Sequence, residues 1–192
     1  MPNLTFQQFT GLSCGAACLL VAAKELGIAQ MPDMTGSGVP NTGMWIGQPL
    51  ELSNGCERAI YAVTANGVDT YSMPDGIARA GQMLGLDVSV SMSGCVVPKV
   101  LEWKYPNVRD QLDELGVEIL SGTPALAENE RMLVAVGIGG LGLHWVLYRS
   151  DGTYMDPAYA RNYTCSLWGM GQLGVLRYID TGIYVVVGTP TV

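Results

Sequence analysis

Histidine is almost absent from this sequence, since His144 is the only one among 192 residues. Any chemistry that needs an imidazole must therefore use this side chain. The five cysteines include no CxxC pair, and one histidine cannot complete the usual ligand set of a zinc site. We therefore expect neither a bound metal ion nor a cofactor. An odd number of widely spaced cysteines cannot form a complete set of disulfides, which favours reduced thiols.

Charged residues are also scarce, at 14%, whereas hydrophobic residues make up 48% of the chain. Disordered chains show the opposite balance, so the composition indicates a folded protein with a sizeable core. The formal net charge is -7, which gives an acidic surface that repels phosphate groups. The sequence therefore argues against nucleic-acid binding and against a polybasic contact with anionic lipid.

Long apolar runs are missing as well. No run reaches the roughly 18 residues that a membrane-spanning helix needs, so we expect no membrane insertion. The first ten residues lack the basic and apolar regions of a secretory signal. We therefore expect the protein in the cytoplasm of the producing cell, or exported as an effector by a route that needs no signal peptide.

The periodicity of apolar residues changes along the chain. Helical patterns cover residues 13–26, 56–65, 75–84 and 107–115. Strand patterns cover residues 88–97, 132–138, 143–149, 153–155 and 175–187, with Thr181 and Gly182 expected to turn or bulge the last one. Residues 31–55 are rich in Gly, Pro, Asn and Thr and predict an irregular loop. The order predicts one α+β domain over 1–192, with an N-terminal helical layer packed on a C-terminal antiparallel sheet.

Cys14 is the first candidate for chemistry, because Ser13 is a plausible N-cap and the helix would begin at the cysteine. Backbone N–H groups at a helix start favour the thiolate, which is the nucleophilic form. Gly15 and Ala16 are small enough to let a carbonyl group approach the sulfur. The alternative is a buried cysteine with no role in chemistry.

His144 lies in an apolar strand pattern and is the only possible base for a Cys–His mechanism. Burial among apolar neighbours is expected to keep the imidazole neutral. The alternative is a core histidine with a satisfied hydrogen bond.

Asp156 would end the strand that follows the hairpin turn at residues 150–152. This position places its carboxylate beside His144, where it could orient the imidazole. The alternative is an ordinary Asp-Pro turn. Gln8 lies six positions before Cys14 and could share an oxyanion site with the Cys14 N–H group, although the adjacent Gln7 is also possible.

Four short stretches together resemble the papain-like cysteine peptidases: Gln8 with five residues between it and Cys14, CGAACL at 14–19, HWVLY at 144–148 and DPA at 156–158. Within that superfamily they look most similar to bacteriocin-processing, double-glycine-leader peptidases and their stand-alone relatives. The resemblance implies a papain-like fold and thiol attack on an amide carbonyl. Ser13 departs from it, because the family often has an acidic residue there. Residues 31–130 match nothing in it, and no transporter membrane domain follows.

The triad thus predicts a cysteine peptidase or amidase that acts on a peptide or protein through a thioester. The same groups could instead support glutamine deamidation or transamidation. Substrate choice is expected to depend on the 31–55 loop with Trp45. Two other classes remain as alternatives: a catalytically idle peptide-binding module, and a redox protein that uses Cys14 and Cys18.

Overall fold

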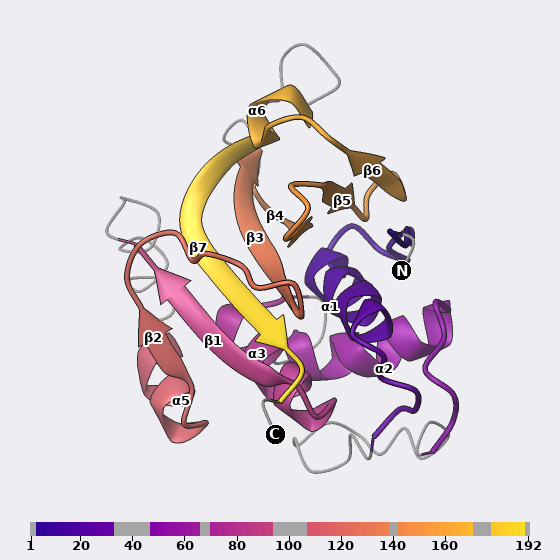
Figure 1. Ribbon diagram of the computed structural model, residues 1–192. Coiled ribbons are helices and arrows are strands. Elements are labelled where there is room, and N and C mark those ends of the chain that lie inside the picture. The colour runs from indigo at the N-terminus through magenta and orange to yellow at the C-terminus, as the bar shows by residue number, and fades with distance from the viewer. Residues whose placement is uncertain are drawn as a thin grey trace.

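The computed structural model describes residues 3–32, 47–65, 70–93, 107–138, 142–170 and 178–190. Its helices are α1 (Cys14–Glu25), α2 (Asn54–Thr64), α3 (Pro74–Met83), α5 (Val108–Glu114) and α6 (Leu167–Met170). Its strands are β1 (Asp87–Met92), β2 (Glu118–Leu120), β3 (Glu130–Ile138), β4 (Leu143–Arg149), β5 (Tyr154–Asp156), β6 (Arg161–Tyr163) and β7 (Tyr178–Gly188) (Figure 1).

The four expected helices are present, and each of the five expected strand regions contains a strand. The short elements β2, β6 and α6 were not expected. Helix α2 begins at Asn54 because Ser53 caps it, with its side chain accepting a hydrogen bond from the Cys56 N–H. The irregular segment therefore ends earlier than residue 55. Residues 33–46, with Trp45, lie outside the described residues, as do 94–97 and 175–177 of the expected strands.

The strands form one sheet in the order β2-β1-β7-β3-β4-β5-β6. Among the described strands, β1 and β2 pair in parallel and the other neighbours are antiparallel. Strand β7 lies in the middle between β1 and β3, although it comes last among the described strands (Figure 1). The expected α+β architecture, with helices packed on a mostly antiparallel sheet, is confirmed.

The expected irregularity at Thr181 and Gly182 is a bulge in β7. The register with β3 shifts between Val134 and Val136, and Gly182 has a φ of 76°. The Thr181 hydroxyl donates a hydrogen bond of 2.7 Å to the carbonyl of Ala135, at the point where the pairing is interrupted. The bulge therefore bends the strand without leaving this buried carbonyl unpaired.

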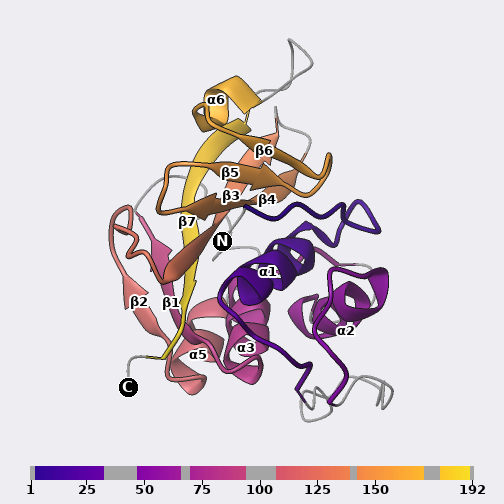
Figure 2. The same ribbon diagram turned by 45° about the vertical axis from the view of Figure 1, so that its right-hand side comes forward.

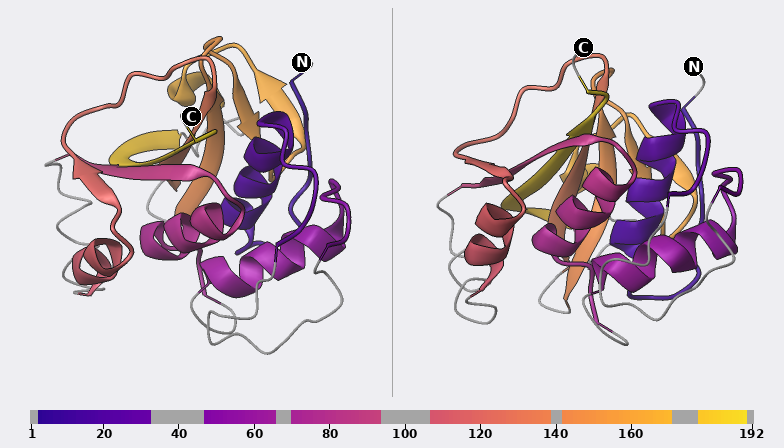
Figure 3. Two further views of the ribbon diagram at one scale, coloured as in Figure 1. Left: turned by 60° about the horizontal axis from the view of Figure 1, so that its bottom comes forward. Right: turned by 90° about the horizontal axis from the view of Figure 1, so that it is seen from below.

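Two hydrophobic cores lie on the two faces of the sheet. The larger one joins α1, α2 and α3 to one face, and these helices lie together on that side (Figure 3). The smaller core on the other face includes Val146, Tyr163, Met170 and Tyr178. Strand β4 contributes to both, because Trp145 and Leu147 belong to the larger core and Val146 to the smaller one.

Helix α1 is enclosed on nearly all sides, since every residue in it except Lys24 is buried. The helix ends at Glu25, and Gly27, which follows the C-cap residue Leu26, has a φ of 86° and donates its N–H to the Lys24 carbonyl. Helix α1 runs beneath β4 and β5 (Figure 2). In the described part of the chain, no helix is both long and apolar enough to cross a membrane.

The last residue of α1, Glu25, belongs to a buried ionic cluster. It pairs with Arg149 at the end of β4 and with Arg131 on β3, at 2.8 and 2.7 Å. Arg149 also donates hydrogen bonds to Thr153, to Asn162 and to the carbonyl of Leu4. This cluster joins the N-terminal segment, α1 and the strands β3, β4 and β6, and we call it the Glu25 cluster.

Candidate active site

Cys14 is the first residue of α1 and is fully buried. Ser13 occupies the N-cap position, as expected, but within the described residues its side chain makes no capping hydrogen bond. Its hydroxyl donates instead to the Thr10 carbonyl, at 3.1 Å. The backbone N–H groups in the first turn of a helix have no intrahelical acceptor, so the Cys14 thiol lies beside polar hydrogens that the cap does not use.

Gly15 is small for a different reason from the one expected. A Cβ atom added to Gly15 would lie 2.5 Å from the Cβ of Ser72. The missing side chain therefore makes room for Ser72, not for a substrate carbonyl. The Ser72 carbonyl accepts a hydrogen bond from the Trp145 indole at 2.9 Å, and the Trp145 carbonyl accepts one from the Cys18 thiol. These contacts dock α1 closely against β4.

His144 lies near the start of β4, opposite Val136 on β3, and is only 5% exposed. Its Nε2 atom lies 2.8 Å from Oδ1 of Asp156. The side chain of Cys14 also contacts the imidazole, close enough to raise the pKa of His144. Because Nε2 faces Asp156, Nδ1 is the nitrogen left for the thiol. The structure thus brings the three predicted side chains into one chain of contacts, from Asp156 through His144 to Cys14.

Asp156 ends β5, which pairs with β4 across the expected hairpin. Its carboxylate accepts three hydrogen bonds: from His144, from the Ala158 N–H at 2.9 Å and from the Tyr178 hydroxyl at 2.7 Å. Burial favours the neutral acid, but the hydrogen bond and charge of His144, followed by the other two donors, lower the pKa of Asp156. The carboxylate is therefore held ionised in a fixed orientation.

The expectation that burial keeps His144 neutral is wrong. Burial does lower the pKa of His144, but the hydrogen bonds to Asp156 and Cys14 and the charges of both raise it to about 9. The imidazolium is therefore the main form at neutral pH. Apolar neighbours in the sequence indicated the desolvation correctly, but they did not reveal the two partners that outweigh it.

Gln8 is half-buried, whereas Gln7 is exposed, as expected for alternate residues of an extended segment. The Gln8 backbone N–H donates to the Pro157 carbonyl at 2.9 Å, which places this segment beside Asp156. Its side-chain Nε2 donates to the Thr10 carbonyl at 2.6 Å. Ser13, the residue before Cys14, donates to the same carbonyl. The Thr10 carbonyl therefore links the Gln8 amide to the start of α1.

Sequence reasoning missed Tyr178 and Glu57. Tyr178 begins β7, and its ring lies 5.6 Å from the His144 ring, measured between centroids. Burial and the charge of Asp156 raise the pKa of Tyr178, so its hydroxyl keeps the proton that it donates. A tyrosine in a strand carries no signal of such a role. Glu57 is fully buried on α2, and a charged residue among the apolar positions of a helix was a signal that could have been used.

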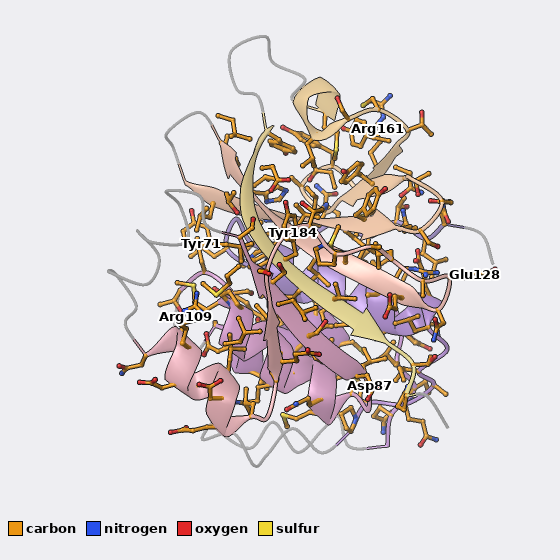
Figure 4. The ribbon with its side chains drawn as sticks, turned by 60° about the vertical axis from the view of Figure 1, so that its left-hand side comes forward. Tyr71, Asp87, Arg109, Glu128, Arg161 and Tyr184 are labelled. Atoms are coloured by element: carbon orange, nitrogen blue, oxygen red, sulfur yellow. The ribbon has the colours of Figure 1, made fainter. Side chains whose placement is uncertain are left out.

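No cluster of three or more possible metal ligands occurs among the described residues. Cys14, Cys18, Cys56 and Cys165 are free thiols, and Cys95 lies outside the described residues. A cavity of about 520 Å³ lies elsewhere, between the ends of β1, β3 and β7, and its lining includes Asp87, which is labelled in Figure 4. It shares no residue with the Cys14–His144–Asp156 site.

Comparison with known proteins gives the family. The family described as "Invasion plasmid antigen J, cysteine protease" matches residues 6–190. Cysteine protease IpaJ of Shigella flexneri is 37% identical over 206 residues, which cover 96% of this chain and 78% of that protein. The chain belongs to the IpaJ cysteine protease family. Both the cysteine site at the start of α1 and the His–Asp pair on β4 and β5 lie within the matched region.

Membership of the IpaJ family makes the protein a cysteine protease and its substrate a protein. It favours an enzyme over a catalytically idle peptide-binding module. The Cys18 thiol has its own partner, since it donates a hydrogen bond to the Trp145 carbonyl. Burial raises the pKa of Cys18 well above the ordinary value. A thiol in that state is a poor nucleophile, which disfavours a redox pair with Cys14.

Proposed function

We propose that this protease cleaves a peptide bond with Cys14 as nucleophile, His144 as acid and base, and Asp156 as the group that orients His144. The observation that carries the proposal is the continuous chain of contacts from Asp156 through His144 to Cys14, joining a β5 carboxylate, a β4 imidazole and an α1 thiol. The family supports cysteine chemistry in general, and these contacts supply candidates for each role.

In the reactive form, Nδ1 of His144 already carries the proton that Cys14 has given up, and the sulfur attacks the carbonyl carbon of the substrate. The C=O π electrons move to the oxygen and give a tetrahedral oxyanion. We assign its stabilisation to the Cys14 N–H and to Gln8. The Gln8 amide has two N–H bonds, and only one is needed for the contact with Thr10. The resemblance to double-glycine-leader peptidases supports this role for Gln8.

In the second step, the C–N bond breaks, His144 gives its proton to the leaving nitrogen, and a thioester remains on Cys14. Water then attacks the thioester while His144 accepts its proton, and the sulfur leaves as the acid product forms. Asp156 stays ionised throughout and stabilises the imidazolium. Because Cys14 is fully buried, substrate entry must displace the groups that cover the thiol.

The test combines N-terminal profiling with trapping of the intermediate. A cell lysate treated with the wild-type protein should gain new protein N-termini, and lysates treated with Cys14→Ala or His144→Ala should not. A peptide spanning a cleavage site should give an acyl adduct on Cys14 after an acid quench. Glutamine residues converted to glutamate without new N-termini would contradict peptide cleavage and indicate deamidation.

A further inference from the structure

Glu57 is a buried acid that the proposed mechanism does not use. It lies in the first turn of α2 and is 0% exposed, although its neighbours Cys56, Ala59 and Ile60 belong to the apolar core. Burial raises the pKa of Glu57 to about 7, even though hydrogen bonds from Ser13 and Phe9 and the charge of Arg58 lower it. A buried carboxyl group needs hydrogen-bond donors, so the donors that contact Glu57 identify the segment that it fixes.

The donors to Glu57 come from one short loop. The Phe9 nitrogen lies 3.2 and 3.1 Å from the two carboxylate oxygens, and the side chain of Ser13 is also in contact with Glu57. These two residues bracket the turn that leads into α1. Gln8 precedes this turn, and Cys14 follows it directly. Glu57 therefore holds both ends of the segment that separates the two proposed oxyanion donors.

Other α2 side chains hold the same loop. The guanidinium carbon of Arg58 lies 5.0 Å from the centroid of the Phe9 ring. The Tyr61 ring meets Phe9 edge-on, with the centroids 5.9 Å apart. Helix α2 and α1 lie side by side in two views (Figures 2 and 3). The loop thus packs against α2, while the residue before it, Gln8, contacts Pro157 just after β5.

The carbonyl of Thr10 links these contacts to the Gln8 side chain. It accepts from Gln8 Nε2, and it also accepts from the Ser13 hydroxyl, which is in contact with Glu57. A shift of the loop would move the acceptor that orients the Gln8 amide. Oxyanion donors act through their position, and an error of about 1 Å is enough to lower turnover substantially.

We propose that Glu57 is a positioning residue, which fixes the loop over residues 9–13 so that the Gln8 amide and the first N–H of α1 face the same oxyanion. This inference rests on the proposed function, since it needs Gln8 as a donor. It does not give Glu57 contact with the substrate. It predicts that Glu57 acts on turnover through Gln8, and not on the thiol through His144.

A double-mutant cycle tests the inference. The variants are Glu57→Ala, Glu57→Gln, Gln8→Ala and each Glu57 change combined with Gln8→Ala, with the exposed Glu51→Gln as the control acid near the same helix. Turnover and KM are measured on a peptide that spans a cleavage site found by N-terminal profiling. Thermal midpoints and the rate of Cys14 alkylation by iodoacetamide are measured for every variant.

Glu57→Ala should lower kcat about tenfold or more, with KM and the alkylation rate nearly unchanged. Glu57→Gln should recover much of this loss, because its amide oxygen still accepts from Phe9. In the Gln8→Ala background, neither Glu57 change should lower kcat further. Glu51→Gln should behave like the wild-type protein.

Losses of kcat that multiply in the double variants would overturn the inference, and so would unchanged kcat in both Glu57 variants. A matching fall in alkylation would also overturn it, by placing Glu57 in support of the thiol. If Glu57→Ala does not fold, Glu57→Gln carries the test through a smaller loss that must vanish in the Gln8→Ala background. Cleavage retained by Cys14→Ala would refute the proposed function itself, which is a different outcome.

Discussion

Helix α1 and strand β4 run side by side and carry one buried polar cluster at each end. At the starts of the two elements, Cys14 meets His144 and Asp156. At their ends, Glu25 meets Arg149 and Arg131. Both clusters consist of ionisable groups held together by short contacts in a nearly water-free place, yet they differ in how completely their hydrogen-bonding groups are used.

Arg149 has partners for its Nε atom and for both of its terminal nitrogens, on Glu25, Thr153, Asn162 and the Leu4 carbonyl. Such a site has little further capacity to bind anything. The other cluster ends at a thiol, which can form a new bond with carbon. The comparison teaches that burial and charge alone do not mark a candidate active site, and that an incompletely used reactive group at the end of a polar chain does.

The largest expected effect is on activity at the Cys14 end. His144→Ala should lower turnover at least about a thousandfold, because the members of the proposed triad would act as a unit and His144 is the only histidine. The thermal midpoint should change far less than in variants of the Glu25 cluster. Kinetics on a cleavage-site peptide and thermal unfolding measure the two quantities. Near-normal turnover of His144→Ala would contradict the proposed mechanism.

The opposite result is expected at the Glu25 end. Arg149→Met should lower the free energy of unfolding by about 3 kcal/mol or more, because Glu25 is then left in the core without its main partner. Turnover per folded molecule should stay within a factor of a few of the wild-type value. Urea unfolding measures the free energy of unfolding, and active-site titration gives the turnover per folded molecule. A loss of turnover at full stability would show that the two ends of β4 are coupled.

Gln8→Ala should lower turnover by roughly a hundredfold, the usual cost of one lost oxyanion donor. The thermal midpoint and the rate of Cys14 alkylation should remain nearly unchanged. Gln7→Ala is the matched control, since Gln7 is exposed. If Gln7→Ala were the damaging change, the donor would be the neighbouring residue.

A smaller effect is expected on the pKa of His144, which can be compared directly between the wild-type protein and Asp156→Asn. Because it is the only histidine, one imidazole signal in the NMR spectrum should titrate near pH 9. In Asp156→Asn, the pKa should fall toward or below the ordinary 6.5, since burial then acts with one partner fewer.

Stability should follow the same shift. A folded pKa above the unfolded value stabilises the protein fully below pH 6.5, and this contribution is lost as the pH rises through 9. The wild-type free energy of unfolding should therefore fall over that range more steeply than that of Asp156→Asn. Equal slopes would mean that His144 is not charged in the folded protein.

The smallest effect is expected from Tyr178→Phe, which keeps the ring beside His144 and removes one donor to Asp156. The pKa of Asp156 should rise, because the lost hydrogen bond favoured the carboxylate. Stability that depends on the ionised form should then be lost at a higher pH during acid unfolding. The midpoint of acid unfolding, with Tyr159→Phe as an exposed control, measures this shift.

The fold class and the meeting of Cys14, His144 and Asp156 could be predicted from local patterns. A small-residue helix start, an apolar strand and a hairpin followed by Asp-Pro each have a short-range signature, and the resemblance to a known superfamily connected them. Elements of three or four residues, such as β2, β6 and α6, are too short to show a period.

The remaining parts depend on contacts between distant residues. Glu25 and Arg149 are 124 positions apart, and nothing near either one indicates the other. Glu57 holds a backbone N–H, which every residue but proline offers, so its partner leaves no trace in the sequence. Tyr178 and Asp156 meet only because β7 inserts into the centre of the sheet. Sequence patterns indicate elements well but do not fix such pairings.

The central place of β7 sets the order in which the protein can mature. A ribosome makes α1 and its cysteine first, yet β1 and β3 share a neighbour only after residues 178–188 have been made. Until then the nascent chain has a thiol and an imidazole but lacks the strand that joins the two parts of the sheet and supplies Tyr178 to Asp156. Closing these distant contacts is also slow compared with local helix formation. We therefore expect the chain to gain proteolytic activity only after β7 has left the ribosome.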